Sequence, residues 1–260
     1  MILLIITITV SLLITIGLPI AAGFWLNKKF SVPWRVITYG ALGYFIVQAL
    51  ITLVFRGFNG LVQNESLALS EQGFTTAQIW LSVFLGALLG VLVRWLGMKF
   101  LNENLDNLES AYGIGVGYGG AESIMLVGLP LLTTFITMLS NMNIDPQTSN
   151  LDPLVIQQIE ELWQVPATIP LVGSLERIAA FVTHLTVTIL VLQVFTRDRK
   201  LWLAAAFGLE LVVNGLIVGL ADLGLDYGWV ILIALVIMMG NLYLLFRLRA
   251  FEFDITKGQG

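Results

Sequence analysis

Three ionisable side chains fall within nine residues of an otherwise apolar stretch, ERIAAFVTH, which runs from Glu176 to His184. A charged group at the centre of a membrane helix costs about 2.5 to 3.5 kcal/mol, so such groups need partners or a water-filled cavity. Arg177 and His184, the only histidine of the protein, are seven positions apart and share one helix face. Metal binding and proton transfer are the chemistries that these residue types could perform. The alternative is a polar helix end followed by a hydrogen-bonded core histidine.

Another carboxylate, Glu122, follows a glycine-rich run that begins at Gly113, GIGVGYGG. Five glycines in a helix cost roughly 1 kcal/mol each relative to alanine in water, which indicates that a neighbouring backbone or a substrate approaches closely. A phosphate-binding loop would need a preceding β-strand and a soluble nucleotide site, which this chain does not offer. The alternative is a tight helix crossing in which Glu122 is hydrogen-bonded for structure alone.

A third polar pair, Glu210 and Asn214, lies one turn apart within an apolar segment. Counting along the expected helices places Glu122 and Glu210 each about 15 Å from the same membrane face, and His184 about 20 Å from it. Helix tilt can absorb the difference. We therefore expect the side chains of Glu122, His184 and Glu210 to meet near mid-membrane, with Arg177 paired to a nearby carboxylate.

The composition indicates the class of protein that holds these residues. Of 260 residues, 57% are hydrophobic and 12% are charged, which is typical of an all-α, polytopic membrane protein rather than a soluble domain. We expect residues 1–260 to form one integral membrane domain in the cell membrane, in contact with the lipid bilayer. There is no basic block to bind nucleic acid, and the absence of cysteine excludes thiolate chemistry.

Seven stretches are long enough to span a bilayer at roughly 20 residues each, so the sequence predicts a bundle of seven transmembrane helices. Asp152 and Pro153 begin a further short helix, with Asp152 as its N-cap, which we expect to lie in the membrane interface and to be anchored by Trp163. The first span is expected to kink at Pro19. The spans are predicted at Met1 to about Leu26, Pro33 to Phe55, Ala77 to Phe100, from Gly113 onward, a fifth ending at Arg197, Leu201 to Leu220, and Trp229 to Leu248.

Lysine and arginine predict the orientation of these spans. With Arg177 taken as the one basic residue inside a span, Arg56 falls on one side and all the others fall on the opposite side. By the positive-inside rule the larger set is cytoplasmic, which places the N-terminus outside and the C-terminus inside. The larger set comprises Lys28, Lys29, Arg35, Arg94, Lys99, Arg197, Arg199, Lys200, Arg247, Arg249 and Lys257.

Two stretches, GIGVGYGGAE and ERIAAFVTHLTVTILV, resemble the YhfC family of intramembrane metalloproteases, which is related to the PrsW and CAAX-protease-like peptidases. The resemblance covers about Pro33 to Phe246. In that family a histidine precedes the glutamate of the first motif, and the sixth span has a histidine four residues before Asp or Asn. Tyr118 and Glu210 stand where these two histidines would be. The positions that match are Glu122, Glu176, Arg177, His184 and Asn214.

The resemblance implies zinc or another divalent metal, for which the ligands in this chain would be His184, Glu210 and Glu176. A carboxylate can replace an imidazole as a zinc ligand, whereas Tyr118 is a much poorer ligand. Two of the histidines expected as ligands are therefore replaced in this chain.

The catalytic residues that the resemblance implies are Glu122, Arg177 and Asn214. A hydrolytic site needs a group that takes a proton from water, which suits Glu122, and donors to the oxyanion, which suits Arg177 or Asn214.

Three functions are compatible with these residues. The first is a membrane-embedded, metal-dependent endopeptidase that cuts membrane or membrane-adjacent peptides. The second is a catalytically altered relative that binds a membrane partner as a binding or scaffold protein. The third is a small proton-linked transporter that uses Glu122, His184 and Glu210 as a relay. Metal content separates the first from the third, and activity of a metal-loaded sample separates the first from the second.

Overall fold

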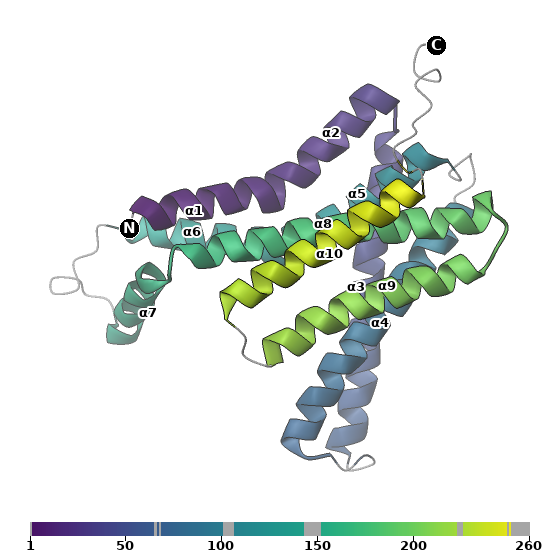
Figure 1. The fold of residues 1–260 in the computed structure, drawn as a ribbon. Helices are drawn as coiled ribbons and strands as arrows, with labels where there is room; N and C mark the ends of the chain where they lie inside the picture. Colours follow the sequence, from purple (N-terminus) through teal and green to yellow (C-terminus); the bar gives the residue numbers. More distant parts are fainter. Residues whose placement is uncertain are drawn as a thin grey trace.

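The computed structural model describes residues 2–64, 67, 69–100, 107–142, 152–222, 226–248 and 250, and every regular element within these ranges is a helix. Seven helices are long and apolar enough to cross a membrane, which confirms the predicted all-α, seven-span class. The orientation, with the N-terminus outside and the C-terminus inside, stays a prediction. The elements, drawn in Figure 1, are α1 (Ile2–Leu12), η1 (Leu13–Gly17), α2 (Leu18–Phe30), α3 (Trp34–Gln63), α4 (Glu71–Phe100), α5 (Leu108–Ser123), η2 (Ile124–Gly128), α6 (Leu129–Ser140), α7 (Pro153–Gln164), α8 (Thr168–Thr196), α9 (Leu201–Asp222) and α10 (Tyr227–Arg247).

Helix α8 is the central element of the bundle and the most buried of the seven spans. It packs against α1, α4, α5, α9 and α10, and it passes through the middle of the view in Figure 1. Asn241 of α10 donates to the Thr183 hydroxyl of α8 at 2.9 Å, which fixes α10 beside the segment that carries His184. The helix with the three ionisable residues is thus held from several sides.

The glycines of α5 allow a close helix crossing between α5 and α3. A Cβ atom at Gly117 would collide with the Ile37 carbonyl, and one at Gly40 would collide with the Ile114 carbonyl. A Cβ at Gly119 would lie 3.1 Å from the Cβ of His184. The expected close backbone approach at the glycine-rich run is therefore confirmed, and it brings α5 against both α3 and α8.

Two spans are interrupted by single π-helical turns, η1 and η2, each of which is followed by a proline. Proline has no N–H and cannot satisfy the carbonyl four residues earlier. For Pro19 that carbonyl belongs to Thr15, and the Ser123 hydroxyl donates to it at 2.9 Å. The π turn Leu13–Gly17 lies directly before the position at which a kink was expected, and the kink itself stays a prediction. Helix α5 supplies the hydrogen bond that proline removes.

The connection between the second and third spans is shorter than predicted. The sequence indicated a polar loop over residues 57–76, whereas α3 continues to Gln63 and α4 begins at Glu71. The rings of Phe58 and Phe74 stack with centroids 5.5 Å apart, and Gln78 donates to the Asn59 side chain at 2.9 Å. These contacts extend the helical hairpin beyond its apolar core.

The short helix predicted after Asp152 is present as α7. The Asp152 carboxylate accepts from the Leu154 N–H at 2.8 Å, as expected for an N-cap. Trp163 packs against an apolar cluster that contains Leu4, Ile8 and Met138. No span lies between Asn141 and Pro166 among the described residues, and positions 143–151 of this connection fall outside them.

Candidate functional site

The three side chains expected to meet do so in the centre of the bundle, which confirms the prediction from helix depth. The Nε2 atom of His184 lies 3.0 Å from Glu122 Oε2, and its Nδ1 atom lies 3.6 Å from Glu210 Oε1. These residues come from α8, α5 and α9. His184 and Glu210 are buried, whereas the Glu122 side chain keeps 19% of its surface exposed.

Arg94 of α4 lies within the same cluster, and its assignment to the charged edge of a span was wrong. Its side chain is fully buried. The Nη1 atom donates to Glu210 at 3.0 Å to Oε2 and at 3.2 Å to Oε1, and Nη2 lies 2.7 Å from His184 Nδ1. Arg177 is therefore not the only arginine inside a span, and the cytoplasmic set loses one member.

The Arg94 guanidinium lies in a space bounded by an aromatic ring and a glycine. The Tyr118 ring lies under it at 3.8 Å from its centroid, a cation–π contact. At Gly90, one turn before Arg94, a Cβ atom would come within 3.1 Å of Arg94 Nη1 and the Tyr118 hydroxyl and within 3.2 Å of Glu210 Oε1. The absence of a side chain at Gly90 thus gives these polar groups their space.

The protonation state of His184 follows from its partners. An arginine can only donate hydrogen bonds, so Nδ1 of His184 accepts from Arg94. The imidazole is then neutral, carries its proton on Nε2, and donates a hydrogen bond through Nε2–H to Glu122 Oε2. A proton on Nδ1 would face a guanidinium N–H at 2.7 Å.

Arg177 holds the other end of the cluster. Its Nη1 atom donates to Glu122 Oε1 at 3.4 Å, and its Nη2 atom donates to Glu176 Oε1 at 3.3 Å. These contacts are long, and the side chains are 13% exposed for Arg177 and 27% exposed for Glu176. The expected pairing of Arg177 with a carboxylate is confirmed.

Asn214 is the sequence-predicted site residue that the structure does not bring into this network. It is half-buried on α9, one turn beyond Glu210. Within the described ranges its side chain makes no hydrogen bond to Glu122, His184 or Arg177. Its role as an oxyanion donor stays a prediction, as do the catalytic roles of Glu122 and Arg177.

Comparison with known proteins places the chain in a family. A family model described as YhfC intramembrane metalloprotease matches residues 11–238. The chain belongs to the YhfC family. A similar protein, the "Uncharacterized membrane protein YhfC" of Bacillus subtilis (strain 168), is 25% identical over 213 residues, which make up 76% of this chain and 77% of that protein. No solved structure matches the chain.

The YhfC family name implies a metal, which the donor atoms of this arrangement do not fit. His184 offers no free lone pair, since Nδ1 accepts from Arg94 and Nε2 carries the proton. Both oxygens of Glu210 contact Arg94 Nη1, and Glu176 contacts Arg177. Over the described part of the chain, no three carboxylate or imidazole side chains form a group that could hold a metal ion. A divalent cation would also lie beside the positive charge of Arg94.

Arg94 is the residue that sequence reasoning missed, although two signals pointed to it. Three intramembrane carboxylates were identified with Arg177 as their only fixed cation, so the set lacked positive charge. In addition, Arg94 follows Gly90 by one turn, which places it on the glycine face that a neighbouring helix approaches.

Proposed function

We propose that this protein is a catalytically altered member of the YhfC family, which binds a membrane-embedded partner without metal-dependent hydrolysis. The observation that carries this proposal is the position of Arg94, whose guanidinium bonds to both His184 and Glu210. In place of a metal cation among imidazole and carboxylate ligands, this chain has a cation of its own.

The two departures from the family pattern support this function because both lead to the same residue. Tyr118 and Glu210 stand where the family pattern has histidine, and both contact Arg94, one through its ring face and the other through its carboxylate. An aromatic ring and a carboxylate are the preferred neighbours of a guanidinium. Both replacements therefore suit an arginine better than a metal.

An added metal would meet an energetic cost at Arg94. Removing one partner of a buried ion pair typically costs about 3 to 5 kcal/mol, because the other charge stays buried without compensation. A metal on His184 would have to displace Arg94, whose Nε atom already lacks a hydrogen-bond partner among the described residues. Binding of the metal would have to offset that cost.

Metal analysis of the purified full-length protein tests the proposal. After incubation with zinc and removal of the excess, we expect the wild-type protein to retain no more metal than its His184→Ala variant. A variant with Tyr118→His, Glu210→His and Arg94→Leu recreates the family's ligand types and is expected to retain more. Stoichiometric metal in the wild type that His184→Ala removes, together with peptide cleavage, would overturn the proposal.

A second candidate function is the metal-dependent membrane endopeptidase named by the family, acting on membrane or membrane-adjacent peptides. The contact between Glu122 and His184 favours it, since a carboxylate beside an imidazole suits proton transfer. Zinc or another divalent metal would require Arg94 to leave His184. Under this function Glu122→Gln loses cleavage and keeps metal, whereas His184→Ala loses both.

A further inference from the structure

The pattern W-L-x-x-K-F occurs twice in the chain, and each copy forms the last residues of a helix. It ends α2 as Trp25–Phe30 and α4 as Trp95–Phe100. The ammonium group lies over both aromatic rings of its copy, 5.4 and 5.6 Å from the centroids for Lys29 and 4.8 and 5.0 Å for Lys99. Both lysines are exposed, and neither forms an ion pair with a carboxylate among the described residues. Each ammonium group can therefore accept an anionic partner.

The α4 copy borders an apolar groove between α3 and α4. The groove has a volume of about 500 Å³, and its lining includes Leu96 and Phe100 of this copy and Ile46 of α3. None of the described residues that line it is acidic. The aromatic residues of the α2 copy, Trp25 and Phe30, line neither this groove nor the groove between α2 and α3. The two copies thus share their ring contacts and differ in their relation to the groove.

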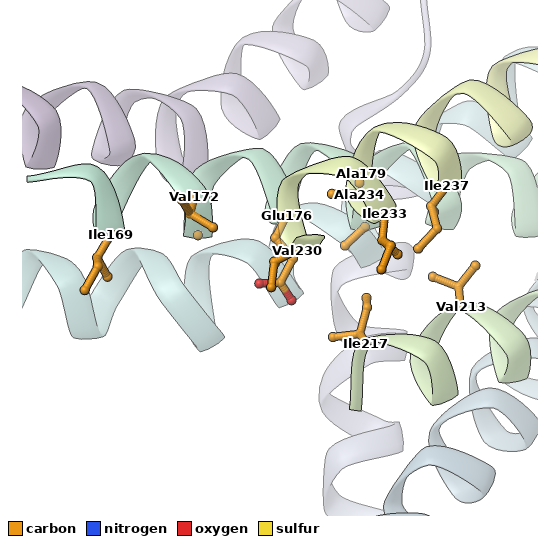
Figure 2. Close-up of a pocket in the computed structure, with 12 residues that line it drawn as sticks. Ile169, Val172, Glu176, Ala179, Val213, Ile217, Val230, Ile233, Ala234 and Ile237 are labelled. Atoms are coloured by element: carbon orange, nitrogen blue, oxygen red, sulfur yellow. The ribbon is translucent and has the colours of Figure 1, made fainter. Parts of the chain in front are cut away.

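The accessible charge at the α3–α4 groove is that of Lys99. Arg94 also borders this groove, but its side chain is fully buried and donates to Glu210. A groove between α8, α9 and α10 has the opposite sign of charge, because Glu176 is the charged residue of its lining, and Figure 2 shows this carboxylate among aliphatic side chains. An anionic ligand is therefore favoured at the α3–α4 groove.

The α3–α4 groove extends from one membrane face to about the middle of the bilayer. Arg35 and Arg56 bound the apolar part of α3 and are 21 positions apart, about 31 Å along the helix, which matches a hydrocarbon core of about 30 Å. Ile46, the lining residue of α3 farthest from Arg35, lies about 16 Å beyond it. On α4 the lining reaches Phe100, next to Lys99. A groove limited to one leaflet fits an acyl chain, whereas a membrane helix of a partner protein would cross both leaflets.

We propose that the α3–α4 groove binds an acyl chain of an anionic phospholipid, and that the phosphate of this lipid pairs with Lys99. The ammonium group lies at the end of the span, which is the level of the lipid headgroups, and its contacts with the Trp95 and Phe100 rings hold it beside the groove. One lysine near the membrane surface increases the affinity for anionic lipid about fivefold. This inference is independent of the proposed function.

Photolabelling of the full-length protein in phosphatidylcholine nanodiscs tests the headgroup contact. The probes are trace amounts of phosphatidylglycerol and phosphatidylcholine, each with a diazirine near the end of one acyl chain, and peptide mapping measures labelling of residues 93–100. In the wild type we expect about fivefold more labelling by phosphatidylglycerol. Lys99→Gln should remove this preference. Lys29→Gln removes an equivalent charge and equivalent ring contacts away from the groove, so it should keep the preference.

Filling the groove tests the acyl-chain contact without changing charge. Ile46 lines the groove and is 51% exposed, so Ile46→Trp should fold normally and occupy part of the space. We expect it to lower the labelling of residues 93–100 by both probes. Leu53→Trp is the matched control, because Leu53 is also exposed on α3 and lies outside the groove lining. It should be labelled as the wild type is.

Three outcomes would overturn the inference. The first is equal labelling of the wild type by the two probes. The second is an equal loss of preference in Lys29→Gln and Lys99→Gln, which would indicate general attraction to the charged membrane face. The third is unchanged labelling in Ile46→Trp, which would place the acyl chain outside the groove.

Discussion

The ionic cluster, formed by Arg94, Glu210, His184, Glu122, Arg177 and Glu176, has two ends that differ in how far their side chains are buried. At the Arg94 end, the guanidinium and Glu210 are 0% and 2% exposed and their shortest contact is 3.0 Å. At the Arg177 end, the contacts lengthen to 3.3 and 3.4 Å and the side chains are 13 to 27% exposed. His184 and Glu122 join the two ends. One end is thus closed within the bundle, and the other end leaves part of its charge exposed.

The difference follows from which helices cover each end. Arg94 is enclosed by α4, α5, α8 and α9, through Gly90, Tyr118, His184 and Glu210. Glu176 instead faces the groove between α8, α9 and α10. Ion pairs of similar composition can therefore have different functions, because burial decides whether a charge is a structural or a binding group.

The largest effect is expected from breaking the closed end with Glu210→Leu. This change leaves the buried Arg94 charge without its carboxylate, which should lower the free energy of unfolding by about 3 to 5 kcal/mol. Denaturant unfolding in detergent micelles measures it, with Glu160→Leu on the exposed surface of α7 as the control. A loss below about 1 kcal/mol is typical of an exposed ion pair and would contradict the assignment of Arg94 and Glu210 as a buried, structural pair.

A smaller effect is expected from crowding the same end with Gly90→Ala. The new methyl group would lie 3.1 to 3.2 Å from three polar atoms, and overpacking of this kind costs about 1 to 3 kcal/mol. Gly86→Ala, one turn earlier on α4, adds a methyl group that meets nothing within 4 Å and should not destabilise the protein. Equal unfolding free energies for the two variants would show that the Arg94 guanidinium and its neighbours can move aside without loss of stability.

The smallest effect on stability is expected from Glu176→Gln at the open end. Because its contact with Arg177 is long and partly exposed, the change should cost at most about 1 kcal/mol in unfolding. A destabilisation as large as that of Glu210→Leu would remove the distinction between the two ends.

Residue type and helix depth were sufficient to predict the spans and the meeting of Glu122, His184 and Glu210. Apolar length defines a span, and in a bundle every intramembrane ionisable residue requires a partner at its own depth. The α7 helix was predictable for a local reason, the Asp152 cap followed by proline. These features depend on sequence patterns that act over short distances.

The position of Arg94 could not be obtained in the same way. It lies six residues before the end of α4, about 9 Å along the helix, a depth that is normally assigned to the charged edge of a span. Its burial depends on how α4 packs against α9 and α5, which is a tertiary property. The hairpin between α3 and α4 was underestimated for a related reason, since Phe58 and Phe74 stabilise each other only across the turn.

The π turn η2 joins two halves of one span, α5 and α6, that differ in how much of their surface is buried, and it sets the rotation of α6 relative to α5. Before it, residues 110–120 of α5 are all buried, whereas Met138 is the buried residue of α6. One additional residue per turn rotates everything beyond it by about 100°. Deleting a residue between Ile124 and Gly128 would therefore turn Leu129–Ser140 onto a different side and separate Met138 from its cluster with Leu4 and Ile8. Sequence length in this segment is under a geometric constraint that its apolar composition does not reveal.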